Sequence, residues 1–310
     1  PDARIAREIR AREGVGGVGW IGVRPGEEPL GMLDHPPGIY AGVVGHHVAR
    51  EAYAALRPAA TAVGEPPLVL TAAPRESLAD GVRLYGPLAA YLSTVVGRPV
   101  LYQHPGSWGV YRTEMVRGRY DLVFDGPHFN AYRAERLNHE VLVRLPEVYQ
   151  FAIIGRQDLF FTSMQRLAGR TFCSLAPPNL GAQVLLDLYG NPARQPVLVP
   201  VENWRAVYDG VIAGRCTGGV LPLALLRSYD QQGRSRVLFF SSEMPHQALS
   251  AGPRVSVSER QRLRTALTSA AADEPTRALR ASQRSAGFVP ARNADYVEMA
   301  RYLRNEWGFY

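Results

Sequence analysis

The chain contains no lysine, so arginine supplies all of the basic side chains behind its formal net charge of +7. These arginines are dispersed and form no long run, which argues against a nucleic-acid interface and favours a GC-rich coding background. No apolar run of about 18 residues occurs, so we expect no transmembrane helix. The basic balance is nevertheless compatible with an anionic ligand.

Cysteine is almost absent, and the familiar catalytic motifs are missing. Cys173 and Cys216 are the only two cysteines, too few and too isolated for a zinc site. The sequence has no Gly-x-Ser-x-Gly, P-loop, His-Glu-x-x-His or Cys-x-x-Cys motif, and the glycines of "GVGGVGW" at 14–20 do not fit the G-x-G-x-x-G frame. We therefore predict a protein that is not an enzyme and that carries no metal and no cofactor.

An internal repeat indicates the architecture. The 310 residues, 46% of them hydrophobic, are enough for two domains with real cores. "APRESLADGVRLYG" from Ala73 and "APPNLGAQVLLDLYG" from Ala176 are each followed by a Pro-Val-Leu strand, a tryptophan-led helix and a Gly-Arg pair. Two units with these matching landmarks predict two similar α/β lobes, each built as β-α-β-α-β.

The stretch from Thr171 to Gly190 combines a short strand at 172–175 with a following helix. We expect Pro178 at the first helical position, where its missing N–H is no loss. The free N–H groups and the positive end of the helix dipole would make this helix start an anion site. A plain strand-to-helix connection is the alternative.

Polar residues follow the predicted strands of both copies. In open α/β sheets the ligand lies beyond the carboxyl ends of the strands, so two facing lobes would share one cleft. Ser107 and Asn203 stand directly before the tryptophan-led helices and fit as their N-caps. The predicted ligand-binding set is Arg75, Ser107, Asp125, His128, Asn179, Leu180, Gly181 and Asn203.

Three stretches carry a family resemblance: "RGRYDLVFDGPHFNAYRAERL", "LAGRTFCSLAPPNLGAQ" and "FFSSEMPHQALSAGPRVSVSERQRLRTAL". Over residues 67–309 the chain resembles the phosphate/phosphite/phosphonate-type periplasmic binding proteins of ABC transporters. The resemblance implies a two-lobed type II periplasmic binding protein fold, with crossings near 150–154 and 239–248 and a last helix in "DYVEMARYLRNEWGFY". We expect lobe one at 65–151 and 240–310, lobe two at 152–239, and an N-terminal extension of unknown role at 1–64.

The chain departs from this family at the start of the lobe-two helix. Phosphonate binders usually carry a Ser-Thr-Ser-Gly-like run there, whereas this chain has residues 178–181, Pro-Asn-Leu-Gly. Leu221 and Pro222 stand where an acidic residue could meet an amino group, so an aminoalkyl-phosphonate is not expected. We expect main-chain contacts to the anion from Asn179, Leu180 and Gly181. Arg75, Ser107 and His128 would converge from lobe one, and Asp125 would orient a neighbouring donor.

The resemblance implies a monomeric receptor in the periplasm that captures a small oxyanion and delivers it to an ABC transporter permease. The alternative is a sensing subunit for a histidine kinase, which would recognise arsenite or another small anion. The sequence leaves both partners open. Because the chain starts at Pro1, a leader or a larger upstream segment is expected to have been removed.

The same fold would make the strands of Cys173 and Cys216 parallel neighbours in lobe two. An oxidising periplasm could then join them in a disulfide. Two buried free thiols are the alternative.

Overall fold

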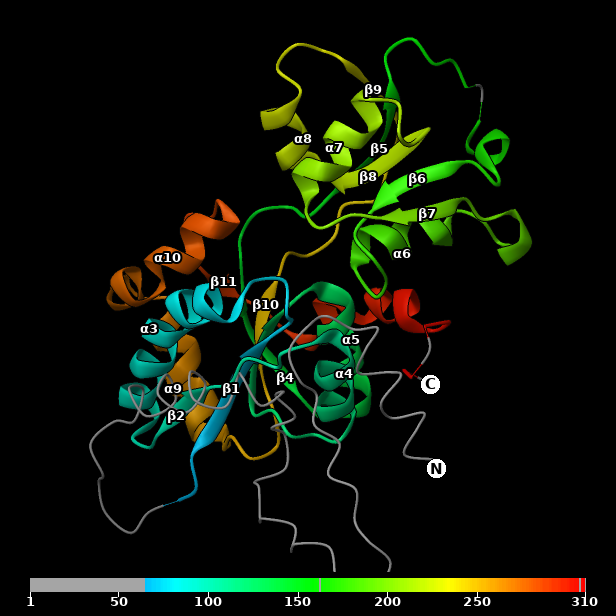
Figure 1. The fold of residues 1–310 in the computed structure, drawn as a ribbon. Helices are drawn as coiled ribbons and strands as arrows, with labels where there is room; N and C mark the ends of the chain where they lie inside the picture. The colour runs from blue at the N-terminus through cyan, green and yellow to red at the C-terminus, as the bar shows by residue number, and fades with distance from the viewer. Residues whose placement is uncertain (1–64, 162, 307, 310) are drawn as a thin grey trace, which may run out of the picture. The chain divides into compact units, whose positions relative to one another are not determined.

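The computed structural model describes residues 65–161, 163–306 and 308–309. The predicted extension at 1–64 lies outside them. The described strands form two sheets (Figure 1). The six-stranded sheet has the order β11-β4-β10-β3-β1-β2, with β1 at Leu68–Ala72, β2 at Val100–Tyr102, β3 at Leu122–Asp125, β4 at Glu140–Arg144, β10 at Ala248–Ala251 and β11 at Val289–Pro290. The five-stranded sheet has the order β7-β6-β8-β5-β9, with β5 at Phe151–Arg156, β6 at Thr171–Ser174, β7 at Val197–Pro200, β8 at Gly218–Pro222 and β9 at Ser235–Phe240.

The two sheets contain the same parallel unit, as the internal repeat predicts. In lobe one, β1 pairs in parallel with β2 and β3, and in lobe two, β6 pairs in parallel with β7 and β8. The α-helices of lobe one are α3 at Leu78–Val96, α4 at Trp108–Val116, α5 at Pro127–Arg136, α9 at Val257–Leu267 and α10 at Asp273–Gln283. Those of lobe two are α6 at Leu180–Asp187, α7 at Trp204–Ile212 and α8 at Leu223–Tyr229. Single turns of 3-10 helix are η1 at Met164–Leu167, η2 at Pro192–Arg194 and η3 at Ala270–Ala272.

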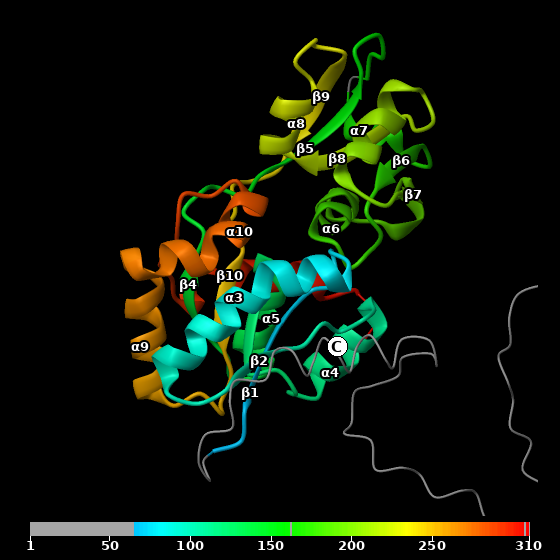
Figure 2. The same ribbon diagram turned by 60° about the vertical axis from the view of Figure 1, so that its left-hand side comes forward.

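Each sheet is covered by helices on both faces. In lobe one, α3, α9 and α10 cover one face and α4 and α5 the other (Figures 1 and 2). The first face buries an aliphatic core that includes Leu70, Leu84 and Leu249, and the second an aromatic cluster with Tyr111 and Phe129. In lobe two, α6 lies on one face of the sheet and α7 with α8 on the other. This layering leaves the carboxyl ends of the parallel strands free for a site.

Two segments connect the lobes, and both differ slightly from their predicted positions. Strand β5 already begins at Phe151, because its side chain and the next three are fully buried against β8 and β9. The first crossing is therefore residues 145–150 rather than 150–154. The second runs between the end of β9 at Phe240 and the start of β10, and the pair Tyr149 and Met244 bridges the two crossings.

The helix starts test three predictions. Ser107 and Asn203 are confirmed as N-caps, since their side chains accept from the N–H groups of Val110 and Ala206. The position predicted for Pro178 is wrong, because α6 begins at Leu180 after an Asn179 cap. With Pro178 as the first helical residue the N-cap would be Pro177, which has no side-chain acceptor, whereas Asn179 supplies one.

The last helix expected in this sequence is present, but as 3-10 helix rather than α-helix. This segment forms two short 3-10 pieces, η4 at Asn293–Asp295 and η5 at Val297–Leu303. Tyr296 between them has φ of −115° and is fully buried, with its hydroxyl donating to the His246 carbonyl at 2.8 Å. The segment packs against α5 of lobe one and α6 of lobe two. No helix in the part of the chain that the structure describes is long and apolar enough to cross a membrane.

Candidate functional site

A small cavity lies where strand-end residues of both lobes meet. Its volume is about 10 Å³, which is room for about one water molecule. The loops after β1, β3 and β6 and the two crossing segments all contribute to it. The residues that line it are Arg75, Trp108, Gly126, His128, Phe129, Tyr149, Asn179, Leu180 and Gln247.

Arg75 is the cationic group of this cavity, and two neighbours hold its guanidinium. Its Nη2 donates to Oδ1 of Asp125 at 2.6 Å, and its Nη1 donates to Oε1 of Gln247 at 3.2 Å. Gln247 is fixed in turn, because its Nε2 donates to Oε1 of Gln283 at 2.8 Å. Burial acts to lower the pKa of Arg75, but Asp125, Glu76 and two tyrosines together outweigh it and raise that pKa above its ordinary value. The guanidinium is therefore a fixed and permanent positive charge.

Asp125 is fully buried and is the carboxylate around which the charged groups gather. Its Oδ2 accepts from Nη2 of Arg133 at 3.1 Å and from the hydroxyl of Tyr111, and the Gly126 N–H donates to its Oδ1 at 2.7 Å. Burial acts to raise the pKa of Asp125, but the two guanidiniums hold it below its ordinary value. These contacts place two donors, Arg75 and Arg133, on Asp125, and its expected role of orienting a donor stays a prediction. Two guanidiniums share this carboxylate, and Glu76 acts on Arg75 as a second negative charge.

His128 forms a contact between the lobes. Only 2% of its surface is exposed, and its ring lies 4.1 Å from that of Phe129, centroid to centroid. Nε2 lies 2.9 Å from the carbonyl oxygen of Pro178, while Nδ1 is buried without a hydrogen-bond partner among the described residues. Burial lowers the pKa of His128 to about 4. The imidazole is therefore neutral at pH 7.

The start of α6 forms the lobe-two side of the cavity. Asn179 and Leu180 are buried and line it. Two of the three main-chain donors predicted here already have partners: Asn179 N–H donates to the Ala176 carbonyl at 3.1 Å and Gly181 N–H to Oδ1 of Asn179 at 2.9 Å. Gly181 lies behind the cap, where a Cβ would be 3.0 Å from the Phe151 ring. The amide of Leu180 and Nδ2 of Asn179 are thus the donors that this turn can offer.

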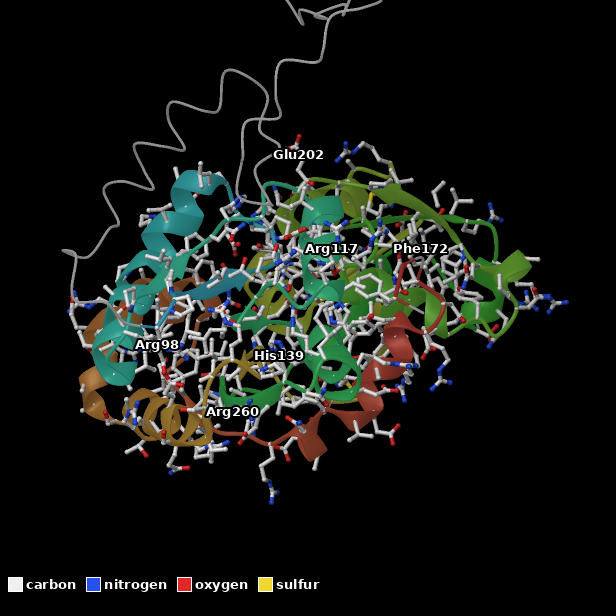
Figure 3. The ribbon with its side chains drawn as sticks, turned by 90° about the horizontal axis from the view of Figure 1, so that it is seen from below. Arg98, Arg117, His139, Phe172, Glu202 and Arg260 are labelled. Atoms are coloured by element: carbon white, nitrogen blue, oxygen red, sulfur yellow. A yellow bond between two sulfur atoms is a disulfide. The ribbon has the colours of Figure 1, made fainter. Side chains whose placement is uncertain are left out.

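Ser107 and Asn203 lie outside the cavity lining. Both side chains are exposed, and each accepts the N–H of its own helix. Glu202, next to Asn203, projects from the surface (Figure 3). Trp108 both lines the cavity and packs on Phe129, with 6.2 Å between ring centroids.

Sequence reasoning missed several residues of the site. Tyr149 and Gln247 lie in the crossing segments, and the hydroxyl of Tyr149 has a pKa that burial raises to about 12. Tyr111 and Arg133 support Asp125 from α4 and α5. The signal available for Tyr149 and Gln247 was their position, because a crossing segment must pass between the lobes. No pattern marks Tyr111 or Arg133, which lie on buried helix faces beside many apolar residues.

Cys173 and Cys216 are joined in a disulfide. Cys173 lies in β6 and Cys216 just before β8, and these strands are parallel neighbours. Among the described residues, no three histidine, cysteine or acidic side chains gather closely enough to hold a metal ion.

Two α/β lobes with two crossings and a cavity at their strand ends define a type II periplasmic binding protein fold. Residues 70–296 match the family described as ABC transporter, phosphonate, periplasmic substrate-binding protein. The chain belongs to this family. Its members are periplasmic proteins that bind a solute for transport and serve an ABC transporter permease. The chain matches no curated protein.

Solved structures share the fold at low sequence identity. XAC2383 from Xanthomonas citri, bound to chloride ion, has a TM-score of 0.64 at 16% identity, over 77% of this chain and 97% of that one. PhnD1 from Prochlorococcus marinus, in complex with methylphosphonate, has a TM-score of 0.60 at 13% identity, over 77% and 97%. A binding protein component of an ABC phosphonate transporter from Pseudomonas aeruginosa has a TM-score of 0.57 at 13% identity, over 77% and 86%.

Proposed function

We propose that this chain is a periplasmic receptor that captures a small oxyanion, such as phosphonate, phosphite or phosphate, between its lobes. It delivers this anion to an ABC transporter permease, acts as a monomer and does not turn its ligand over. The observation that carries the proposal is the Arg75 guanidinium, which lines the cavity and is held by Asp125 and Gln247. No observation favours the sensor-kinase alternative.

The cationic group in the cavity lining explains why the ligand should be an anion. Arg75 and Arg133 share the single carboxylate of Asp125 inside lobe one. A buried positive charge is costly unless an opposite charge or hydrogen bonds compensate it. An anion that enters beside Arg75 supplies this compensation. It also accepts hydrogen bonds from the amide and side-chain donors at the start of α6.

Ligand entry requires the lobes to separate. The cavity holds about one water molecule, which is less than a phosphonate needs. The Nε2 contact of His128 to the Pro178 carbonyl links the two walls and opens when they part. Hinge motion of the two crossing segments would admit the anion, and the permease would recognise the lobes closed on it.

The first test removes the cation. Titration of wild type with methylphosphonate, phosphite and phosphate by calorimetry should show binding of at least one of them. Arg75→Met should weaken that binding by about tenfold to a hundredfold, since a charge-assisted hydrogen bond contributes roughly 1.5–3 kcal/mol. Arg83→Met is the matched control, because Arg83 is exposed and, among the residues that the structure describes, pairs only with Asp80 on the surface of α3. Equal affinity of the two variants would contradict the proposal.

The second test adds a negative charge at the lobe-two wall. Asn179→Asp keeps an N-cap of equal quality but places a carboxylate in the cavity lining. It should abolish the rise in melting temperature that the bound anion gives to wild type. Asn203→Asp makes the same change at a cap outside the cavity and should keep that rise.

A further inference from the structure

The polar atoms around the cavity include donors and one unusual acceptor. Arg75, the Tyr149 hydroxyl and Nδ2 of Asn179 can all donate to a ligand from the cavity lining. The acceptor is Nδ1 of His128, which has no hydrogen-bond partner among the described residues, and only 2% of the surface of His128 is exposed. A buried polar atom without a partner is rare in a native protein and calls for a ligand or a water.

The Pro178 carbonyl determines what Nδ1 can do. A carbonyl oxygen only accepts, so the 2.9 Å contact places a proton on Nε2 of His128. Arg75 and Arg133 disfavour a second proton on the ring, Asp125 favours it, and burial disfavours it most strongly. The ring is then the neutral Nε2–H tautomer. Its Nδ1 is an acceptor.

Gly126 lies beside both this acceptor and the cation, and the space next to its Cα is narrow. A Cβ on Gly126 would lie 3.2 Å from Nδ1 of His128 and 3.5 Å from Nη2 of Arg75. The backbone of Gly126 has an ordinary φ of −66°, so its conformation does not require a glycine at this position. One tetrahedral ligand that reaches this space can meet both groups, with an anionic oxygen toward Arg75 and another oxygen toward His128.

We propose that the receptor selects oxyanions that still carry one proton, with the ligand O–H donated to Nδ1 of His128 and an ionised oxygen facing Arg75. This proposal rests on the proposed function and narrows it. A fully ionised oxyanion, such as a sulfate or a sulfonate, would bring a lone pair against Nδ1 and leave the acceptor unpaired. Such a site distinguishes ligands by a single proton rather than by shape or net charge.

The sharpest probe is a pair of monoanions with the same shape. Methylphosphonate at about pH 6 carries an O–H, and methanesulfonate carries none. Calorimetry on the wild-type chain should show methylphosphonate binding roughly tenfold to a hundredfold more tightly, since an unpaired buried acceptor has a cost of that order. Equal affinities, or tighter methanesulfonate binding, would overturn the selection. If no oxyanion binds at any concentration tested, the proposed function itself fails, and this proposal fails with it.

The pH dependence supplies an independent readout. Methylphosphonate loses its last proton between about pH 6 and about pH 9, so its affinity should fall across this range. Around the cavity, Asp125 has a lowered pKa, Arg75 and Arg133 have raised ones, and burial raises the pKa of Tyr149 to about 12, so these groups keep their charge states. Glu76, beside Arg75, has a pKa that burial raises. Methanesulfonate has no proton to lose in this range, so its affinity should stay constant with pH. A change in its affinity would reveal titration of a protein group such as Glu76. Tighter methylphosphonate binding at high pH would contradict the proposal.

A variant pair assigns the selectivity to one nitrogen. His128→Phe keeps an aromatic ring and removes Nδ1, so the ratio of the two affinities should collapse toward one. His246→Phe makes the same change at a buried histidine that contacts the Tyr149 ring but does not line the cavity, and the ratio should persist. If His128→Phe does not fold, Gly126→Ala fills the space between the acceptor and Arg75 and should weaken methylphosphonate more than methanesulfonate. An unchanged ratio in a folded His128→Phe would overturn the assignment.

Discussion

The two lobes share a topology but differ in what they bury. Every buried charged or histidine side chain of the described chain lies in lobe one, except His246 in the second crossing segment, and lobe two buries only the polar residues Ser174, Asn179 and Gln183. Lobe two has the disulfide instead. The same parallel unit is thus stabilised by a polar cluster in one lobe and by a covalent bond in the other. The comparison suggests that lobe one recognises the charge of the ligand and that lobe two closes over it.

Acid should destabilise lobe one more than lobe two. Burial lowers the pKa of His128 and His246 to about 4 and of His139 to about 3, whereas an unfolded histidine titrates near 6.5. The unfolded chain therefore binds more protons in this window, so the stability is complete above about pH 6.5 and is lost as pH falls toward 4. His139 lies in lobe one near Arg260 (Figure 3), and residues 152–239 contain no histidine.

The expected loss between pH 7 and pH 5 is on the order of 4–6 kcal/mol for the three histidines together. Glu76, Asp121 and Glu306 have raised pKa values and act in the opposite sense, which reduces the net loss. Urea unfolding at a series of pH values measures the slope. His246→Phe should reduce the loss by about a third, and a slope that does not change would contradict the assignment.

Replacing the central carboxylate of lobe one should have the next largest effect. Asp125→Asn keeps the shape but leaves Arg133, which is fully buried, without a charged partner. Breaking a buried ion pair in this way destabilises by about 3–5 kcal/mol. The control in lobe two is Asp209→Asn, since its pair with Arg205 is exposed and should contribute less than about 1 kcal/mol. Similar losses in the two variants, measured by denaturant unfolding, would remove the contrast between the lobes.

The disulfide provides the corresponding experiment on lobe two. The bridge closes a span of 43 residues, and in the loop-entropy picture it stabilises by about 4 kcal/mol, with typical measured values of about 2–4. The double variant Cys173→Ala with Cys216→Ala should lose an amount in that range. The affinity for an anion should change little, because neither cysteine lines the cavity. Free thiols in the non-reduced chain, detected by alkylation and mass measurement, would show that the bond does not form.

The fold was predictable because it repeats. Ala-Pro, Tyr-Gly and Trp…Gly-Arg landmarks recur in order, and local signals such as the Ser107 and Asn203 caps follow from single residues. The segment at 293–303 forms 3-10 helix, although its apolar spacing suits an α-helix. Its geometry is set instead by the burial of Tyr296 between elements distant in sequence. Tertiary contacts of this kind are not visible in a local pattern.

The site was predictable only at strand ends. Arg75, Asp125, His128, Asn179 and Leu180 stand next to strands that the pattern locates, and the structure brings them together. The role of His128 could not be derived, because the Pro178 carbonyl that fixes its tautomer lies 50 residues away in the other lobe. Gln247 and Tyr149 depend in the same way on where the crossings run.

We expect the smallest effect from removing the two equivalent N-caps. Ser107 and Asn203 begin the tryptophan-led helices of lobe one and lobe two, and each satisfies one helix N–H with an exposed side chain. Ser107→Ala and Asn203→Ala should each lower the free energy of unfolding by about 1 kcal/mol and leave anion affinity unchanged. Equal losses would show that the lobes match wherever the ligand is not involved. A loss of affinity in either variant would extend the site to the helix starts and weaken the division between recognition and closure.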